Sequence, residues 1–90
     1  MITEKDKKTI REISNKYNVK KVLLFGSSLS PEIESHDIDL GVEGISAKDF
    51  FRFYGDLIMA LSKPVDVIDL SGETTLFIKM VKQEGIPLYG

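Results

Sequence analysis

The sequence predicts a small α/β (α+β) fold, in which a mixed β-sheet is covered by helices mainly on one face. Two observations predict this class: helix-like and strand-like patterns alternate along the chain, and the apolar runs of the strands are short. A third observation is that the 90 residues contain no repeat, low-complexity tract or linker. We therefore expect a single domain over residues 1–90.

The first helix is predicted over residues 4–17. Thr3 and Asp6 form a capping pattern at its start, and apolar residues then recur at helical spacing. A strand is predicted over residues 21–25, because this apolar run stops at a glycine.

A second strand is predicted over residues 37–42, where acidic or small residues alternate with aliphatic ones. Ser46 and Asp49 form the capping pattern of a second helix, which Pro64 brings to an end. Residues 65–68 form a third apolar run and are the next strand candidate.

The remaining segments complete the pattern. Ser71 is expected to cap a last helix that ends before Gly85, and residues 86–89 are expected to return as a short edge segment. The polar stretch 27–36 is expected to form a short helix or a loop.

The second helix carries an unusually wide apolar face. At 100° per residue, its apolar side chains from Phe53 round to Phe51 cover an arc of roughly 160°, more than the minimal core-facing stripe of about 100°. One interpretation is a helix sunk deep in a small core. The other is that part of this face docks a partner or a second copy of the chain.

Composition limits the possible functions. Apolar residues make up 42% and charged residues 29% of the chain, the balance of an ordinary globular protein. The net charge of -2 disfavours direct binding to DNA or RNA. No apolar run approaches the roughly 20 residues of a membrane span, so a cytoplasmic protein is expected. With no cysteine and one histidine, any metal must be bound by oxygen.

The turn after the first strand is a candidate anion site. Gly26, Ser27 and Ser28 follow the strand directly, and such a turn lets backbone N–H groups and hydroxyls approach phosphate oxygens. The alternative is that this segment is an ordinary turn.

Three aspartates are candidate metal ligands. Asp37 and Asp39 lie two apart on the predicted strand, so they project from the same face with Cα atoms about 6.6 Å apart. Asp66 interrupts an apolar strand, where a buried carboxylate needs a cation or hydrogen-bond donors. Three such acids could hold two magnesium ions; the alternative is a set of solvated surface acids. Asp69 is a rival for the third position, but a role at the start of a turn suits it better.

Taken together, these segments resemble the signature of the minimal nucleotidyltransferases of the DNA polymerase beta superfamily. The resemblance rests on Phe25-Gly26-Ser27, on Asp37-Ile38-Asp39-Leu40, on the segment 65–70 and on the ending 84–89. It implies the nucleotidyltransferase fold, transfer of AMP from ATP or of another NTP's nucleotide to a hydroxyl of a protein or RNA, and two Mg²⁺ ions.

The resemblance also implies roles and partners. Asp37, Asp39 and Asp66 would be the catalytic, metal-binding residues, and the Gly-Ser turn at residues 26–28 would hold the nucleotide. Family members of this size resemble the antitoxin halves of toxin-antitoxin modules, so an all-helical HEPN-type toxin is the expected partner, with a homo-oligomer also possible.

This sequence departs from the family pattern near the turn. Residues 28–32 contain no basic residue where many relatives have an arginine, and His36 stands where a serine is usual. A non-catalytic antitoxin with a weak or vestigial nucleotide site is therefore the alternative function. A third hypothesis is a folded domain with a chance cluster of acids.

Overall fold

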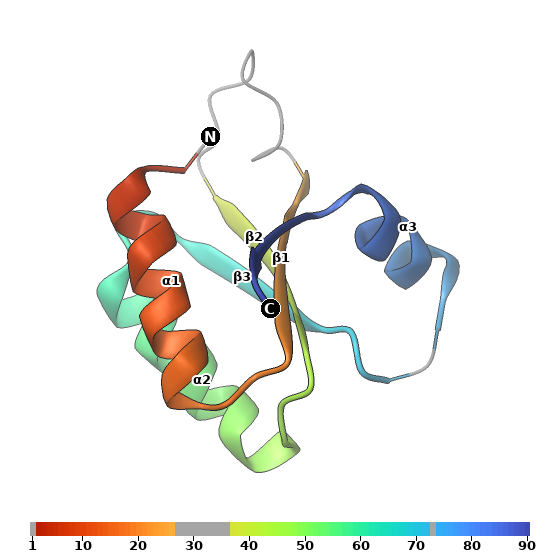
Figure 1. Cartoon of the computed structure of the whole chain (residues 1–90), viewed down its shortest axis with the longest axis horizontal. Coiled ribbons are helices and arrows are strands. Elements are labelled where there is room, and N and C mark those ends of the chain that lie inside the picture. The colour runs from red at the N-terminus through yellow and green to blue at the C-terminus, as the bar shows by residue number, and fades with distance from the viewer. Residues whose placement is uncertain (1, 27–36, 73) are drawn as a thin grey trace.

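The fold is a four-stranded sheet between two unequal helical layers (Figure 1). The computed structural model describes residues 2–26, 37–72 and 74–90. The elements in chain order are α1 (Glu4–Lys16), β1 (Lys21–Phe25), β2 (Ile38–Glu43), α2 (Ala47–Ala60), β3 (Val65–Asp69), α3 (Leu76–Glu84) and β4 (Ile86–Tyr89). Helices α1 and α2 lie together on one face, and α3 lies on the other. The predicted α+β class with helices mainly on one face is confirmed.

The sheet is mixed, with strand order β3-β2-β1-β4. Strand β1 is antiparallel to both of its neighbours, β2 and β4, whereas β2 and β3 run parallel. The parallel pair needs a crossover connection, and α2 supplies it. Strands β3 and β4 are therefore the two edges of the sheet, as predicted for the segment 86–89.

Each face of the sheet has its own apolar cluster. The larger cluster joins the sheet to α1 and α2, with Ile10, Leu40 and Phe53 fully buried within it. The smaller cluster joins Leu23 and Leu70 to Val81 of α3. Because α3 is short, it covers only part of its face.

The helix starts follow the predicted caps with one exception. The Thr3 hydroxyl accepts the Asp6 amide at 3.1 Å, and the Ser46 hydroxyl accepts the Asp49 amide at 3.2 Å. The prediction that Ser71 caps the last helix is wrong, because Thr75 does so.

Ser71 belongs instead to the turn after β3. Its amide donates to the Asp69 carboxylate at 2.8 Å, and its hydroxyl accepts the Gly44 amide at 2.8 Å. Ser71 therefore lies in this turn, and α3 begins later, after Thr75.

Helix α2 is only partly buried. Phe53 and Leu57 have no exposed surface, but Phe51 is 78% and Met59 87% exposed. The interpretation of a deeply sunk helix therefore holds for one stripe of α2 and not for its whole apolar arc.

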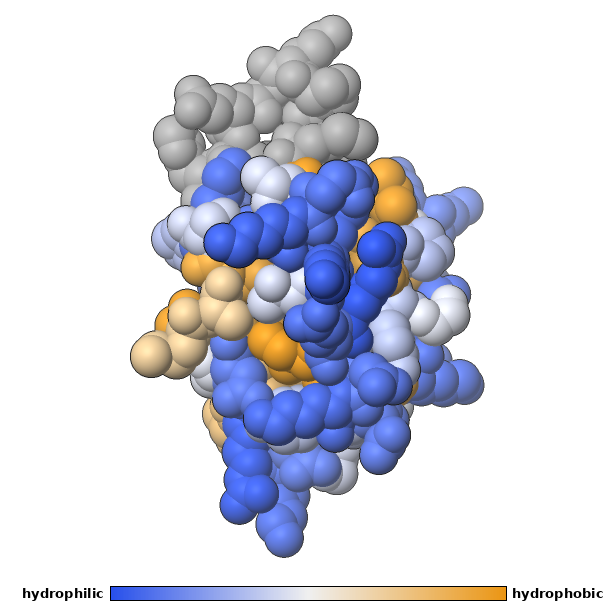
Figure 2. Space-filling view, turned by 60° about the vertical axis from the view of Figure 1, so that its left-hand side comes forward, coloured by the Kyte–Doolittle hydropathy of each residue, from blue (hydrophilic) through white to orange (hydrophobic). Residues whose placement is uncertain are grey.

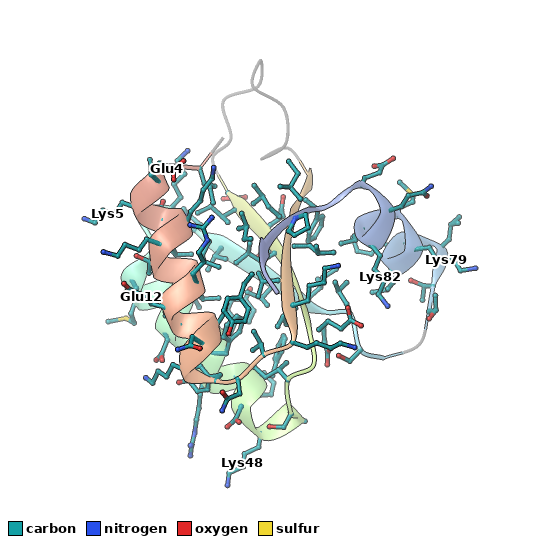
Figure 3. The ribbon with its side chains drawn as sticks, in the orientation of Figure 1. Glu4, Lys5, Glu12, Lys48, Lys79 and Lys82 are labelled. Carbon is teal, nitrogen blue, oxygen red and sulfur yellow. The ribbon has the colours of Figure 1, made fainter. Side chains whose placement is uncertain are left out.

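The outer side of the helical layer is polar. Figure 2 brings the side of α1 and α2 forward and shows a mostly hydrophilic surface with small hydrophobic areas. Glu4, Lys5 and Glu12 project outward from α1 in Figure 3. Within the described ranges, no helix has the length and apolar character that crossing a membrane requires.

Candidate functional site

The structure brings two of the three predicted acids side by side. Asp39 of β2 is the register partner of Asp66 on the parallel strand β3, and neighbouring strands lie about 4.8 Å apart. Ile38 and Leu40, which flank Asp39, are buried against α1 and α2. Asp39 must therefore face the α3 side of the sheet, because side chains alternate along a strand.

Asp37 stands at the entrance to the same strand. Strand β2 begins at Ile38, one residue later than predicted, so Asp37 precedes the strand and is exposed. Asp37 is still near enough to Asp39 for its negative charge to raise the pKa of the Asp39 carboxyl. The two acids thus belong to one electrostatic cluster.

Asp66 is exposed, which corrects the expectation of a buried carboxylate. Its neighbours Val65 and Val67 are buried because they face α1 and α2. Asp66 points the other way, and β3 is an edge strand with one flank free of strand partners. An acid at this position therefore keeps its contact with water.

Like charges meet at Asp39, the centre of the acid cluster. Partial burial, followed by the negative charges of Asp66 and Asp37, raises the pKa of the Asp39 carboxyl above its ordinary value. A cation bound by the carboxylates would remove this repulsion, and oxygen ligands suit Mg²⁺. The donor set therefore fits the ion that the family resemblance implies.

The three acids are not yet a complete ion site. In the described part of the chain, no three carboxylate or imidazole groups are arranged closely enough to hold a metal ion. The three-acid site therefore stays a prediction.

Gly26 packs directly against the acid cluster. Its φ angle is +75°, and a Cβ atom added to it would lie 2.5 Å from Oδ2 of Asp39. Only glycine fits this position without strain or collision. The predicted anion-binding turn therefore begins in contact with the predicted metal ligands, while Ser27, Ser28 and His36 lie outside the described residues.

Asp69, the rival third acid, has a structural role. Its carboxylate accepts the Ser71 amide in the turn after β3, as expected from the turn pattern. Because it lies three residues after Asp66, its side chain leaves the strand on the opposite face.

A small apolar pocket adjoins the same glycine. Its volume is about 150 Å³, and it lies between the end of β1 and α3. The residues that line it are Phe25, Gly26, Phe77, Met80, Val81 and Glu84. We call it the β1–α3 pocket.

From the sequence, Phe25 is predicted as a strand residue, and Phe77, Met80 and Val81 as residues of the last helix, with no pocket between them. Phe77 and Met80 recur at helical spacing, which is the pattern of any core-facing stripe. Only the packing of α3 beside the end of β1 shows that they border a hollow, and Phe77 is 53% exposed there.

The sequence matches the family described as polymerase beta nucleotidyltransferase over residues 7–90. The chain belongs to this family. The glycine turn and the aspartates of β2 and β3 therefore lie within a nucleotidyltransferase domain. The comparison with curated proteins found no match.

Solved structures share the nucleotidyltransferase fold. A toxin-antitoxin structure with AMP-PNP has a TM-score of 0.76 and 23% identity, covering 93% of this chain and 73% of that one. The complex of a tri-AMPylated Shewanella oneidensis HEPN toxin with an MNT antitoxin has a TM-score of 0.72 and 23% identity, covering 94% of this chain and 70% of that one. An MntA-HepT toxin-antitoxin structure has a TM-score of 0.73 and 22% identity, covering 98% and 73%. At these identities the likeness shows a common fold.

Proposed function

We propose that this nucleotidyltransferase uses Mg²⁺ to transfer AMP from ATP to a hydroxyl group of a HEPN-type toxin, and that it acts as the antitoxin of that partner. The observation that carries the proposal is the pairing of Asp39 with Asp66 beside the Gly26 turn, on one sheet face. The family accounts for the reaction type.

The structural neighbours support the choice of donor and acceptor. One of them was crystallised with AMP-PNP, and another contains a HEPN toxin that carries AMP groups. We propose that this chain, which shares their fold, has the same donor and the same class of acceptor.

Each part of the site has a role in this proposal. Asp37, Asp39 and Asp66 hold the magnesium ions, and the backbone from Gly26 through Ser27 and Ser28 holds the phosphates. Magnesium held there would supply Lewis-acid polarisation of the α-phosphoryl group and neutralisation of charge on the pyrophosphate.

The remaining steps fall to the chain's own groups. Asp66 is exposed at the edge of the sheet, where an acceptor hydroxyl can approach, and it takes up the proton of that hydroxyl. The hydroxyl oxygen forms a bond to the α-phosphorus, and the bond from that phosphorus to pyrophosphate breaks. Gly26 lets the backbone come close to the phosphates because it has no side chain.

A second candidate is an antitoxin that neutralises its partner by contact alone. The absence of a basic residue in the segment 28–32 favours it, since such a residue would neutralise phosphate charge. The exposed apolar side chains Phe51, Ile58 and Met59 on α2 also offer surface for a partner.

Mass spectrometry of the partner separates the two candidates. The chain is incubated with ATP, Mg²⁺ and the protein encoded by the neighbouring gene, and we expect the partner to gain one or more AMP groups. Asp39→Asn is expected to abolish the transfer. Asp69→Asn, a matched acid on β3 that keeps its acceptor for the Ser71 amide, is expected to leave it unchanged.

The opposite result is equally clear. If no AMP is transferred while the wild type and Asp39→Asn suppress the partner's activity equally well, the enzymatic function is wrong and the contact mechanism stands.

A further inference from the structure

The β1–α3 pocket is a binding feature that the acids and the phosphate turn leave unexplained. Four of its six lining residues, Phe25, Phe77, Met80 and Val81, carry apolar side chains. The rings of Phe25 and Phe77 meet edge to face, with centroids 5.9 Å apart. Such walls favour a flat, apolar ligand over a charged one.

The size of the pocket selects a single ring group. Its volume is about 150 Å³, and an apolar cavity of about 150 Å³ holds one benzene molecule. A whole nucleoside triphosphate would not fit into this volume. A single aromatic ring system could enter from the open side of the pocket and fill it.

Charge excludes the phosphate end of a nucleotide from the pocket. Among the described lining residues, Glu84 carries the only charge, and it is negative. Lys79 projects from the side of α3 away from β1 (Figure 3) and does not line the pocket. A phosphate would therefore be repelled, whereas an uncharged ring would not.

Gly26 makes the pocket continuous with the acid cluster. It lines the pocket, and an added Cβ would touch the Asp39 carboxylate. Phe25, the residue before it, is the register partner of Asp39. A ligand with its phosphates at Gly26 therefore has the pocket within reach of its other end.

We propose that the β1–α3 pocket binds the base of the nucleotide, with the ring packed against Phe77 and Met80 of α3. This inference rests on the proposed function, because it takes the phosphates to lie at the Gly26 turn. Phe77 is 53% and Met80 49% exposed, so both side chains have surface left for a ligand to cover.

Calorimetric titration tests the inference with two probes, each with Mg²⁺: AMP-PNP, which carries a base, and inorganic tripolyphosphate, which does not. We expect AMP-PNP to bind more tightly than tripolyphosphate. Stacking of a base on an aromatic side chain contributes about 1–3 kcal/mol, so Phe77→Ala is expected to raise the Kd for AMP-PNP at least about five-fold. Met80→Ala is expected to act in the same direction, and neither variant is expected to change the Kd for tripolyphosphate.

Leu76→Ala is the matched control. Leu76 lies on the same helix, is 78% exposed and does not line the pocket, so its removal is expected to change neither Kd. Because Phe77 and Met80 are half exposed, melting temperatures near that of the wild type are expected for all three variants.

The possible results distinguish a failure of the base pocket from a failure of the proposed nucleotidyltransferase function. If both probes bind equally and Phe77→Ala affects neither, the base pocket is wrong while the phosphate site stands. If Phe77→Ala weakens the complex with the partner protein and spares AMP-PNP, the pocket belongs to the partner interface and the inference is again wrong. If neither probe binds, the proposed function fails together with it.

Discussion

At the scale of single residues, the fold places the Asp39 carboxylate where its charged form is unfavourable. Asp39 is half-buried beside two other carboxylates, and its pKa is raised first by burial and then by Asp66 and Asp37. Groups that destabilise a fold are often retained because function needs them. The acid cluster of this chain has that character.

The first prediction concerns the charge of Asp39. Asp39→Asn removes one of the repelling charges, so we expect the variant, without divalent cations, to melt about 2–4 °C above the wild type, corresponding to about 0.5 kcal/mol after solvent screening. Asp69→Asn is expected to leave the melting temperature unchanged, because the amide oxygen of the new side chain would still accept the Ser71 amide.

The effect depends on pH with a definite sign. A carboxyl whose folded pKa is raised destabilises the fold only when it is charged. The advantage of Asp39→Asn is therefore expected to be absent below the ordinary value of 3.8 and complete above the raised pKa. Melting curves at pH 3.5 and pH 7 check this, and an equal gain at both would contradict it.

The second prediction concerns Gly26. Alanine would bring Cβ to 2.5 Å from Oδ2 of Asp39 at a φ of +75°, so Gly26→Ala is expected to cost about 1–3 kcal/mol in unfolding free energy. Gly72→Ala is the control, because a Cβ there would meet nothing within 4 Å. Urea unfolding measures the loss of unfolding free energy in both variants. Equal losses would contradict this prediction.

At the scale of elements, the connection between α2 and β3 is anchored by α1. Asp6 is buried, and its carboxylate accepts the Ser62 hydroxyl at 2.5 Å and the Ser62 amide at 3.3 Å. Two residues on, the Pro64 carbonyl accepts the Ile38 amide at 2.8 Å. The start of β3, where Asp66 lies, is thus tied to both α1 and β2.

The third prediction tests this anchor. Asp6→Ala leaves a small void and removes both acceptors from Ser62, so it is expected to destabilise the fold by about 1–3 kcal/mol. Glu4→Ala is the matched control: Glu4 is an acid in the same first turn of α1, with a side chain 85% exposed. Urea unfolding should show the larger loss for Asp6→Ala; similar losses would mean that the helix dipole, and not the anchor, is responsible.

Most elements were predictable because their signals are local. Strand β1 spans Lys21–Phe25 as predicted, and the caps Thr3 and Ser46 follow from neighbouring residues. The cap of α3 and the exposure of Asp66 were not predictable, since they depend on the turn after β3 and on the place of β3 at the sheet edge. The β1–α3 pocket was not predictable either, because it depends on how α3 packs beside the end of β1.

At the scale of the whole molecule, the two faces of the sheet have different tasks. The face covered by α1 and α2 holds the larger apolar cluster and most of the buried side chains. The face with α3 holds the smaller cluster, the acids and the pocket. The residues that contribute most to stability and those of the proposed site therefore lie on opposite faces of one sheet.

The fourth prediction follows from binding to this second face. A ligand that binds only the folded chain raises its stability by about 2.7 kcal/mol at one hundred times its Kd. We expect AMP-PNP and Mg²⁺ together to raise the melting temperature by about 10–20 °C at that concentration, and either alone to do much less. The same shift in the double variant Asp37→Asn, Asp39→Asn would mean that the nucleotide binds elsewhere.

The parallel pairing of β2 with β3 has a consequence for how the molecule assembles. Positions 39 and 66 meet only after the intervening chain, including α2, has crossed over the sheet. Contacts between distant positions form slowly, because a long loop must close before they contribute. We therefore expect the paired acids to form late in folding, so that nucleotide and metal engage only a molecule whose folding is nearly finished.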